Sequence, residues 1–236
     1  MKYLDMFIED CKYYDLENIE LKLILNNVDV KGKTILDIGT GIGRLAFPLA
    51  KYAKKVIALD SDERLGEYFK KHFCKNLKFV NKKVEDSLER NKKFDIILLA
   101  WPTFNINSID LIKDTMHKKS KFVFITCDNN SDFETIVDRL EVKNLNFGED
   151  VKNKENFLRM LPEKFSIISK KKVKTKYTYP DEETAFRIIK NGIKMWFDIT
   201  LNEKSERKLK EIILDHKQKE AIIFKEKIYF YVMNLK

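Results

Sequence analysis

The sequence predicts an α/β fold of three layers, with a mostly parallel sheet between two layers of helices. Short apolar runs alternate with amphipathic segments along most of the 236 residues, as expected for buried strands and the helices that cover them. Three closely spaced glycines join the first apolar run to the next amphipathic segment, which indicates a tight turn from a strand into a helix.

The composition predicts a globular chain, because 44% of the residues are hydrophobic. No apolar run reaches the roughly 18 residues that a membrane span requires. The segment Met1–Met6 carries an early acid and is followed by no cleavage pattern, so we expect no signal peptide. Cys11, Cys74 and Cys127 are scattered, odd in number and without metal-ligand spacing, which favours a reduced, cytoplasmic protein without a metal.

The charge balance leaves two kinds of partner open. The chain has 46 basic and 37 acidic residues, a net charge of +9. Such an excess is compatible with a nucleic acid, since neutralised phosphates drive that binding. The lysines, however, lie all along the chain instead of forming a local cluster, so a compositional bias is the favoured explanation.

The glycine turn lies in Thr34–Arg44, where Gly39, Gly41 and Gly43 follow an apolar strand that contains Asp37. Glycine allows positive φ and a close approach of a ligand to the backbone. The dinucleotide pattern G-x-G-x-x-G fails, because its third glycine would fall on Arg44. The pattern D-x-G-x-G-x-G fits every position from Asp37 to Gly43.

This pattern resembles the first motif of class I S-adenosylmethionine-dependent methyltransferases. A second strand, Lys55–Leu59, ends at Asp60, which stands 17 residues after Gly43. An acid there can accept hydrogen bonds from both ribose hydroxyls. The resemblance therefore implies S-adenosylmethionine as cofactor, S-adenosylhomocysteine as product and no metal.

The resemblance also implies a set of cofactor contacts. The family places an acid near the adenine after the third strand, but this position falls on Lys83, so Val84 and Glu85 are the expected adenine contacts. The expected cofactor-binding residues are Asp37, Gly39, Thr40, Gly41, Gly43, Asp60, Ser61, Val84, Glu85 and Ala100.

The apolar strand Phe94–Trp101 resembles the fourth motif of the family, beside the transferable methyl group. Base-amine methylases usually carry Asn/Asp-Pro-Pro-Tyr/Phe here, whereas this chain continues Ala-Trp-Pro-Thr-Phe. This departure argues against a DNA adenine methylase. An aromatic wall to an acceptor pocket and simple packing of the tryptophan are both open interpretations. The candidate pocket residues are Tyr14, Trp101, Phe104 and Asp128.

We expect one domain over residues 1–236, comprising an N-terminal helical cap (1–30), a cofactor-binding core (31–142) and sheet completion (143–236) with a helical insertion near 181–217. The resemblance implies a Rossmann-like, seven-stranded sheet of order 3-2-1-4-5-7-6 whose last strand is antiparallel. Residues 109–116 are expected to form a helix. Asn144–Glu163 is expected to be an irregular loop, Phe165–Tyr179 an edge strand, and Asn191-Gly192 the end of a helix. Ala221–Phe224 and Ile228–Val232 are interpreted as a hairpin or one bent strand.

Three functions remain open. A small-molecule methyltransferase is preferred, because the aromatic motif and the capping helices suggest an enclosed pocket. An RNA or protein methyltransferase and a non-catalytic S-adenosylmethionine-binding subunit are the alternatives. His72, His117 and His216 lie on expected helices away from the strand ends, so the catalytic residues are left unassigned. We expect a monomer or homodimer without membrane contact.

Overall fold

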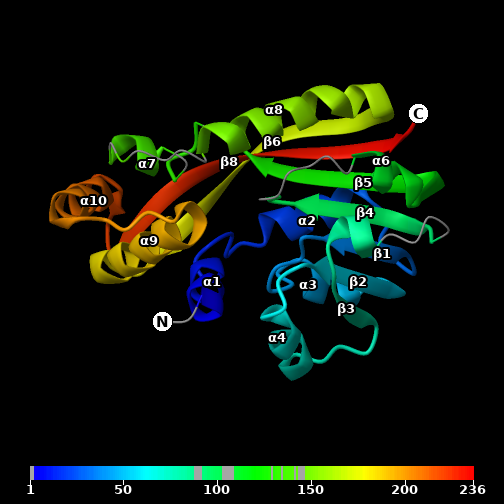
Figure 1. Ribbon diagram of the computed structural model, residues 1–236, viewed down its shortest axis with the longest axis horizontal. Helices are drawn as coiled ribbons and strands as arrows, with labels where there is room; N and C mark the ends of the chain where they lie inside the picture. Colours follow the sequence, from blue (N-terminus) through cyan, green and yellow to red (C-terminus); the bar gives the residue numbers. More distant parts are fainter. Residues whose placement is uncertain are drawn as a thin grey trace. The chain divides into compact units, whose positions relative to one another are not determined.

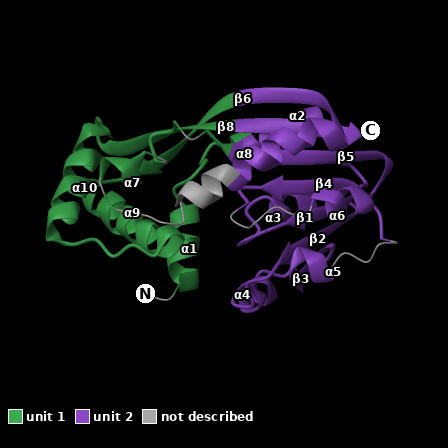
Figure 2. Ribbon diagram, turned by 45° about the horizontal axis from the view of Figure 1, so that its top comes forward, with its two compact units in different colours: residues 1–19, 127–149, 173–228 green, residues 20–126, 150–172, 229–236 purple. Residues whose placement is uncertain are grey.

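The chain divides into two compact units (Figure 2). Unit 1 comprises residues 1–19, 127–149 and 173–228, and unit 2 comprises residues 20–126, 150–172 and 229–236. The computed structural model describes residues 3–87, 92–102, 109–128, 130–133, 135–140, 142 and 147–236. The organisation of the whole chain as one domain stays a prediction.

Helices and strands alternate through the first half of the chain, as the sequence predicted (Figure 1). The helices are α1 (Tyr3–Cys11), α2 (Ile19–Asn27), α3 (Ala46–Ala50), α4 (Leu65–Lys71), α5 (Val84–Ser87), α6 (Ile109–Asp114), α7 (Ile136–Arg139), α8 (Phe147–Lys164), α9 (Glu182–Phe197) and α10 (Glu203–Asp215). The strands are β1 (Thr34–Ile38), β2 (Lys55–Asp60), β3 (Leu77–Asn81), β4 (Phe94–Ala100), β5 (Met116–Cys127), β6 (Phe165–Tyr179), β7 (Lys217–Gln218) and β8 (Ala221–Leu235).

The strand order is β3-β2-β1-β4-β5-β8-β6, with the two-residue strand β7 paired to β8. Strands β1 to β5 pair in parallel, and Ile35 of β1 lies between Val56 of β2 and Ile96 of β4. Figure 1 shows the final strand β8 running opposite to β5. The predicted order, with the last strand inserted between the fifth and sixth, is confirmed.

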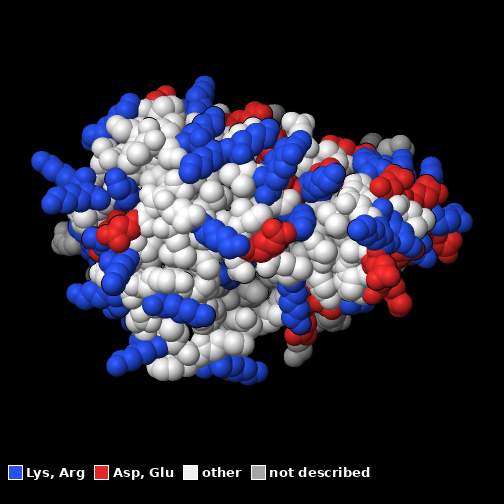
Figure 3. Space-filling view, turned by 180° about the vertical axis from the view of Figure 1, so that it is seen from behind, with Lys and Arg blue, Asp and Glu red and all other residues white. Residues whose placement is uncertain are grey.

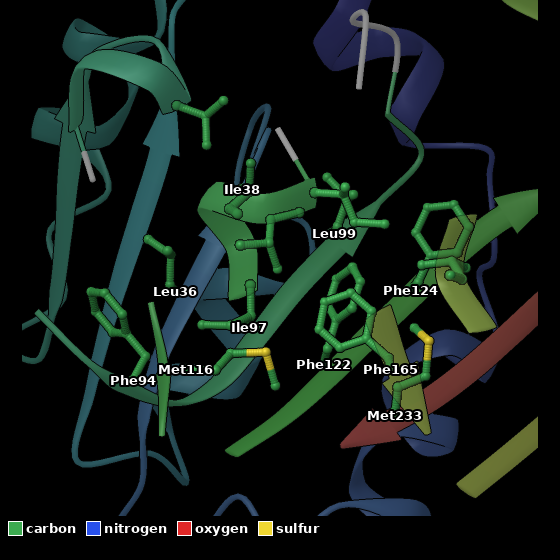
Figure 4. Packing of buried hydrophobic residues seen from close by; sticks show 14 of the residues in the cluster. Leu36, Ile38, Phe94, Ile97, Leu99, Met116, Phe122, Phe124, Phe165 and Met233 are labelled. Atoms are coloured by element: carbon green, nitrogen blue, oxygen red, sulfur yellow. The ribbon is translucent and has the colours of Figure 1, made fainter. Parts of the chain in front are cut away.

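Both faces of the unit 2 sheet are buried, which accounts for its almost uninterrupted apolar strands. On one face, Leu36 and Ile38 of β1 join a hydrophobic cluster with residues of α6, α8 and β5 (Figure 4). The intervening residue Ile35 points to the opposite face, because side chains alternate along a strand, and it is 1% exposed. This double burial agrees with the predicted three layers.

Helix α8 replaces the irregular loop expected over Asn144–Glu163 from Phe147 onward, and the first three residues of that expected loop lie outside the described residues. The segment is rich in charged and amide side chains, so its sequence gives a weak apolar periodicity. Phe157 and Leu161, spaced four residues apart on the helix, are nevertheless fully buried in the core cluster of unit 2. The packing of these two side chains in the core stabilises the helix, although most of its other side chains are polar.

Helix α9 is also longer than expected, because it continues past Asn191-Gly192 to Phe197. Gly192 is buried, and the following Ile193 packs in the core of unit 1. The helix ends where Asp198 takes a φ of +54°, a left-handed stop that Asp tolerates better than most residues.

Strand β8 is one continuous strand, which resolves the two interpretations of the C-terminal region. Its charged segment Lys225-Glu226-Lys227 follows the alternation of a strand: Lys225 is exposed, whereas Glu226 is buried. The two short helices expected in the first thirty residues are present as α1, in unit 1, and α2, which lies in unit 2 except for its first residue.

Candidate functional site

The glycine turn follows β1 and occupies residues 39–45, before α3 begins at Ala46. Gly39, Gly41 and Gly43 have φ angles of +68°, +54° and +75°. All three lie in the left-handed region, which a residue with a Cβ enters only at an energetic cost. The prediction that this turn uses the positive φ angles that glycine allows is confirmed.

The carboxyl end of β2 holds the turn in place. The Leu59 carbonyl accepts hydrogen bonds from the backbone N–H groups of Gly39 and Thr40, at 2.8 and 3.1 Å. Asp60 Oδ2 accepts a further bond from the Gly41 N–H at 2.9 Å. The structure therefore brings the predicted acid directly against the predicted glycine turn.

The Asp60 carboxylate retains capacity for a ligand. Its Oδ1 accepts a hydrogen bond from the Asp62 N–H at 3.0 Å, so each oxygen holds one backbone donor. An ionised carboxylate offers about four lone-pair positions, and Asp60 is half-buried. Two hydroxyl donors on adjacent carbons can still be accommodated at this carboxylate.

Gly43 is required for packing as well as for its backbone conformation. A Cβ at this position would lie 2.8 Å from the ring of Phe47 and 3.0 Å from that of Phe69. These two rings stack at 5.1 Å between centroids, and Phe69 stacks on Phe79 at 4.5 Å. The absence of a side chain at Gly43 thus leaves room for the stacked rings of Phe47 and Phe69.

Asp37 is buried beside the same turn and is only 3% exposed. Its Oδ2 accepts a hydrogen bond from Thr40 Oγ1 at 2.6 Å. Burial raises the pKa of Asp37 to about 7, against the opposing effect of the Thr40 hydrogen bond. The negative charge of Asp60 raises this pKa further, and Arg44 lowers it. Asp37 is therefore a carboxyl group whose ionisation responds to a nearby positive charge.

A buried acid connects the glycine turn to the end of β4. Glu20 of α2 is fully buried, and its Oε1 accepts a hydrogen bond from Trp101 Nε1 at 2.8 Å. Its Oε2 accepts a bond from Arg44, which directly follows the last glycine of the turn. Trp101 itself has a φ of +53°, a strained conformation for a bulky residue.

Sequence reasoning missed Glu20 and Arg44, although Glu20 left a signal. It lies four residues before Ile24 and eight before Val28, so it shares the buried face of α2 with two apolar residues. An acid on a buried helical face requires a partner inside the fold. Arg44 is one of the partners of Glu20, and it stands where the dinucleotide pattern requires its third glycine.

The remaining predicted cofactor residues all belong to unit 2. Ser61 directly follows β2, and Ala100 is the last residue of β4. Val84 and Glu85 open the short helix α5; Val84 is buried in the core cluster, whereas Glu85 is exposed. The structure places all four in loops or element ends after parallel strands, and their contacts with a cofactor stay predictions.

The four predicted pocket residues are not gathered within either unit. Tyr14 and Asp128 belong to unit 1, Trp101 belongs to unit 2, and Phe104 lies outside the described residues. Tyr14 is buried and its hydroxyl lies 3.1 Å from Thr175 Oγ1. A shared acceptor pocket stays a prediction.

The histidines differ from expectation in one case. His117 lies in strand β5, not on a helix, and its Nε2 is 3.2 Å from Asp95 Oδ1. His72 and His216 follow the last residues of α4 and α10. Within the described part of the chain, no three His, Cys, Asp or Glu side chains are grouped so as to hold a metal ion.

The segment that carries the glycine turn is similar in sequence to a known protein family. Residues 35–121 match the family model described as "Methyltransferase domain". A putative type II methyltransferase from Anaeromyxobacter dehalogenans has a similar structure, with a TM-score of 0.61 at 15% identity, over 85% of this chain and 89% of that one. The likeness at this identity concerns the fold.

Two curated relatives each match part of the chain. A probable ribosomal RNA small subunit methyltransferase A of Methanosphaera stadtmanae is 38% identical over 38% of this chain and 34% of its own length. A ubiquinone biosynthesis O-methyltransferase of Pelagibacter ubique is 32% identical over 50% of this chain and 52% of its own length. The chain thus spans between a third and about half of the length of these relatives.

Proposed function

We propose that the chain is a class I, Rossmann-like S-adenosylmethionine-dependent methyltransferase acting on a small-molecule acceptor, in keeping with the match of residues 35–121 to the family model described as "Methyltransferase domain". The observation that carries this proposal is the glycine turn, whose Gly41 amide is hydrogen-bonded to Asp60 at 2.9 Å. A nucleoside with free ribose hydroxyls fits that carboxylate. A dinucleotide fits less well, because Arg44 replaces the third glycine of its pattern.

The residues present fit the chemistry of the proposed cofactor. Asp60 would accept hydrogen bonds from the ribose hydroxyls, and Val84 and Glu85 would contact the adenine. Asp37 would provide negative charge for the ammonium group of the amino-acid portion, since a cation favours its ionised form. S-adenosylmethionine, when bound, supplies an activated methyl group for an in-line displacement. The chain would align the acceptor and exclude water, for which orientation contributes on the order of 7–11 kcal/mol.

The segment after β4 favours a small acceptor. Ala100-Trp101-Pro102 has neither the amide nor the acid that would hold a nucleobase amine. Trp101 is fixed in place by the buried Glu20, so its indole can form a rigid apolar wall. The Pelagibacter relative is named as a ubiquinone biosynthesis O-methyltransferase, which is consistent with a small-molecule acceptor.

A ribosomal RNA acceptor is the second candidate, supported by the name of the Methanosphaera relative and by the net charge of +9. Lys and Arg side chains are abundant on the face shown in Figure 3, but they are scattered among neutral and acidic ones. Dispersed charge of this kind is weaker support for nucleic-acid binding than a clustered footprint. A protein acceptor and a non-catalytic binding subunit stay as further alternatives.

A transfer assay with methyl-tritiated S-adenosylmethionine separates these functions. The protein is incubated with a small-metabolite fraction, total RNA and total protein, each with and without nuclease or protease. Label in the small-metabolite fraction alone supports the proposal, whereas nuclease-sensitive label supports the RNA alternative. Label in none of the fractions, from a protein that binds the cofactor, supports the non-catalytic subunit.

The cytoplasmic location and the state of monomer or homodimer stay predictions. No disulfide joins the three cysteines of the chain. Among the helices that the structure describes, none combines the length and apolar character needed to span a bilayer.

A further inference from the structure

Unit 1 encloses two acidic side chains among aromatic rings. Asp10 of α1 and Glu226 of β8 are 5% and 1% exposed. Both interact with Tyr177 and Tyr179 of β6: burial, and then the negative charge of the two acids, raises the pKa of each phenol well above its ordinary value. Four titratable groups from three elements therefore converge in one place.

Aromatic rings surround this convergence. The ring centroid of Tyr177 lies 4.8 Å from that of Tyr14 and 4.8 Å from that of Phe133. Tyr179 stacks in parallel with Tyr177 at 6.2 Å, and Tyr13 lies 5.3 Å from Tyr179. Tyr13, Phe133 and Tyr177 are only partly buried, so the cluster extends from the interior of unit 1 to its surface.

The protein satisfies only part of the hydrogen-bonding capacity of the Asp10 carboxyl group. Trp196 forms a side-chain hydrogen bond with its carboxyl group. Its Oδ1, and the hydroxyl of Tyr179, are buried without a hydrogen-bond partner among the described residues. In that same part of the chain, no lysine or arginine forms an ion pair with Asp10.

An unpaired buried carboxylate is energetically costly, so this arrangement requires an explanation. Burial raises the pKa of Asp10 to about 7, and the Trp196 hydrogen bond offsets only part of this effect. A cation placed against Oδ1 would restore the charged form. Aromatic faces attract cations as well, most effectively where water is excluded. The cluster does not resemble a metal site, because the described residues contain no group of three metal-ligating side chains.

We propose that this cluster, formed by Asp10, Tyr13, Phe133, Tyr177, Tyr179 and Glu226 and named here the ammonium cluster, binds a small organic ammonium ion. The ammonium group lies against Asp10 Oδ1, and the rings contact its alkyl substituents. Glu226, whose Oε1 accepts a hydrogen bond from the Phe133 N–H at 2.9 Å, adds negative charge and fixes the Phe133 segment. The proposal is independent of the transferase activity proposed above.

The direct test is isothermal titration of the wild-type protein, without cofactor, at pH 8. Choline and butylamine serve as quaternary and primary ammonium probes, and 3,3-dimethylbutan-1-ol and 1-butanol as their neutral counterparts. We expect at least one ammonium probe to bind tenfold or more tightly than its neutral counterpart. Equal affinities within both pairs would overturn the proposal, without any variant being needed.

A matched pair of variants locates the binding. Asp10→Asn removes the charge within the cluster, and Asp5→Asn removes an exposed charge in the first turn of the same helix. Circular dichroism verifies that each variant is folded. We expect at least a tenfold loss of ammonium affinity in Asp10→Asn and less than a twofold change in Asp5→Asn. Equal affinities in the two variants would contradict the assignment to Asp10.

The pH dependence separates ligand binding from a purely structural role. Trp196 of α9 forms a hydrogen bond with Asp10, and Tyr177 and Tyr179 of β6 interact with it electrostatically; Glu226 of β8 interacts with the same two phenols. Because an ammonium ion favours the ionised carboxylate, binding below pH 7 must release a proton. Affinity should rise by up to about tenfold between pH 6 and pH 7. An affinity independent of pH over this interval would contradict the role of Asp10.

Discussion

At the scale of single residues, Asp60 is the best-supported candidate for binding the proposed cofactor. Its two carboxylate oxygens accept backbone bonds from Gly41 and Asp62, which fixes the side chain before any ligand arrives. A fixed acceptor loses little conformational entropy on binding, so its hydrogen bonds contribute more fully to affinity.

Replacing Asp60 therefore tests the ribose contact. Asp60→Ala should weaken the binding of S-adenosylhomocysteine by about 1.5–3 kcal/mol, the range for hydrogen bonds to a charged group. Isothermal titration measures the loss. Asp62→Ala is the matched control, since that acid pairs with Arg64 at 2.7 Å and should leave affinity unchanged. Equal affinities of wild type and Asp60→Ala would refute the assignment.

Substitutions at two glycines distinguish the energetic cost of backbone strain from that of a steric clash. Gly32 and Gly43 have similar φ angles of +70° and +75°, but a Cβ at Gly32 meets nothing within 4 Å, whereas one at Gly43 meets Phe47 at 2.8 Å. Gly32→Ala should cost about 1–2 kcal/mol of unfolding free energy. Gly43→Ala should cost a further 1–3 kcal/mol, roughly, from overpacking. Urea unfolding measures both, and equal losses would contradict the packing role of Gly43.

At the scale of elements, helix α2 connects two parts of the candidate site. Its buried Glu20 accepts hydrogen bonds from Trp101 at the end of β4 and from Arg44 after the glycine turn. The three elements that carry these residues are therefore expected to lose their order together.

Glu20→Ala tests this connection. It should lower the unfolding free energy by about 3 kcal/mol, because it leaves partly buried Arg44 and the Trp101 indole without their acid. Glu17→Ala is the control: Glu17 is an exposed acid paired with Lys176, whose removal should cost below about 1 kcal/mol. Denaturant unfolding followed by tryptophan fluorescence gives both values. A Glu20→Ala loss no larger than that of Glu17→Ala would exclude a connecting role.

The elements also show which features a sequence can reveal. Strands β1, β2 and β4 were predictable because each is an apolar run buried on both faces, and the glycine turn was predictable from its spacing. Helix α8 was not, because its burial depends on Phe157 and Leu161 meeting distant strands. The buried acids Glu20, Asp10 and Glu226 were missed for the same reason: their partners are far away in the chain.

At the scale of the whole molecule, two buried acids with raised pKa values stand out, Asp10 in unit 1 and Asp37 in unit 2. Asp10 and Asp37 have pKa values of about 7, against an ordinary value of 3.8, chiefly because of burial. Between pH 4 and pH 7 the folded chain therefore holds protons that the unfolded chain has released. The stabilisation that these acids contribute is full below pH 4 and is lost as pH rises through 7.

Unfolding free energies measured in urea from pH 5 to pH 8 test this effect. The unfolding free energy of the wild type should decrease as the pH rises from 5 to 7. Asp37→Asn should make this decrease smaller by about 2–3 kcal/mol, because one pKa unit corresponds to 1.36 kcal/mol. Asp5→Asn should leave the slope unchanged, since that acid is exposed. If wild type and Asp37→Asn have parallel pH profiles, Asp37 does not titrate as the structure indicates.

The central claim, that the glycine turn and Asp60 bind S-adenosylmethionine, is tested most directly by thermal melting of the purified protein. S-adenosylmethionine, S-adenosylhomocysteine and NAD are added in parallel. A ligand at 100 times its dissociation constant adds about 2.7 kcal/mol, which raises Tm by a few degrees. We predict a rise with both sulfur nucleosides and none with NAD. A rise with NAD alone, or no rise with either sulfur nucleoside, would contradict the account.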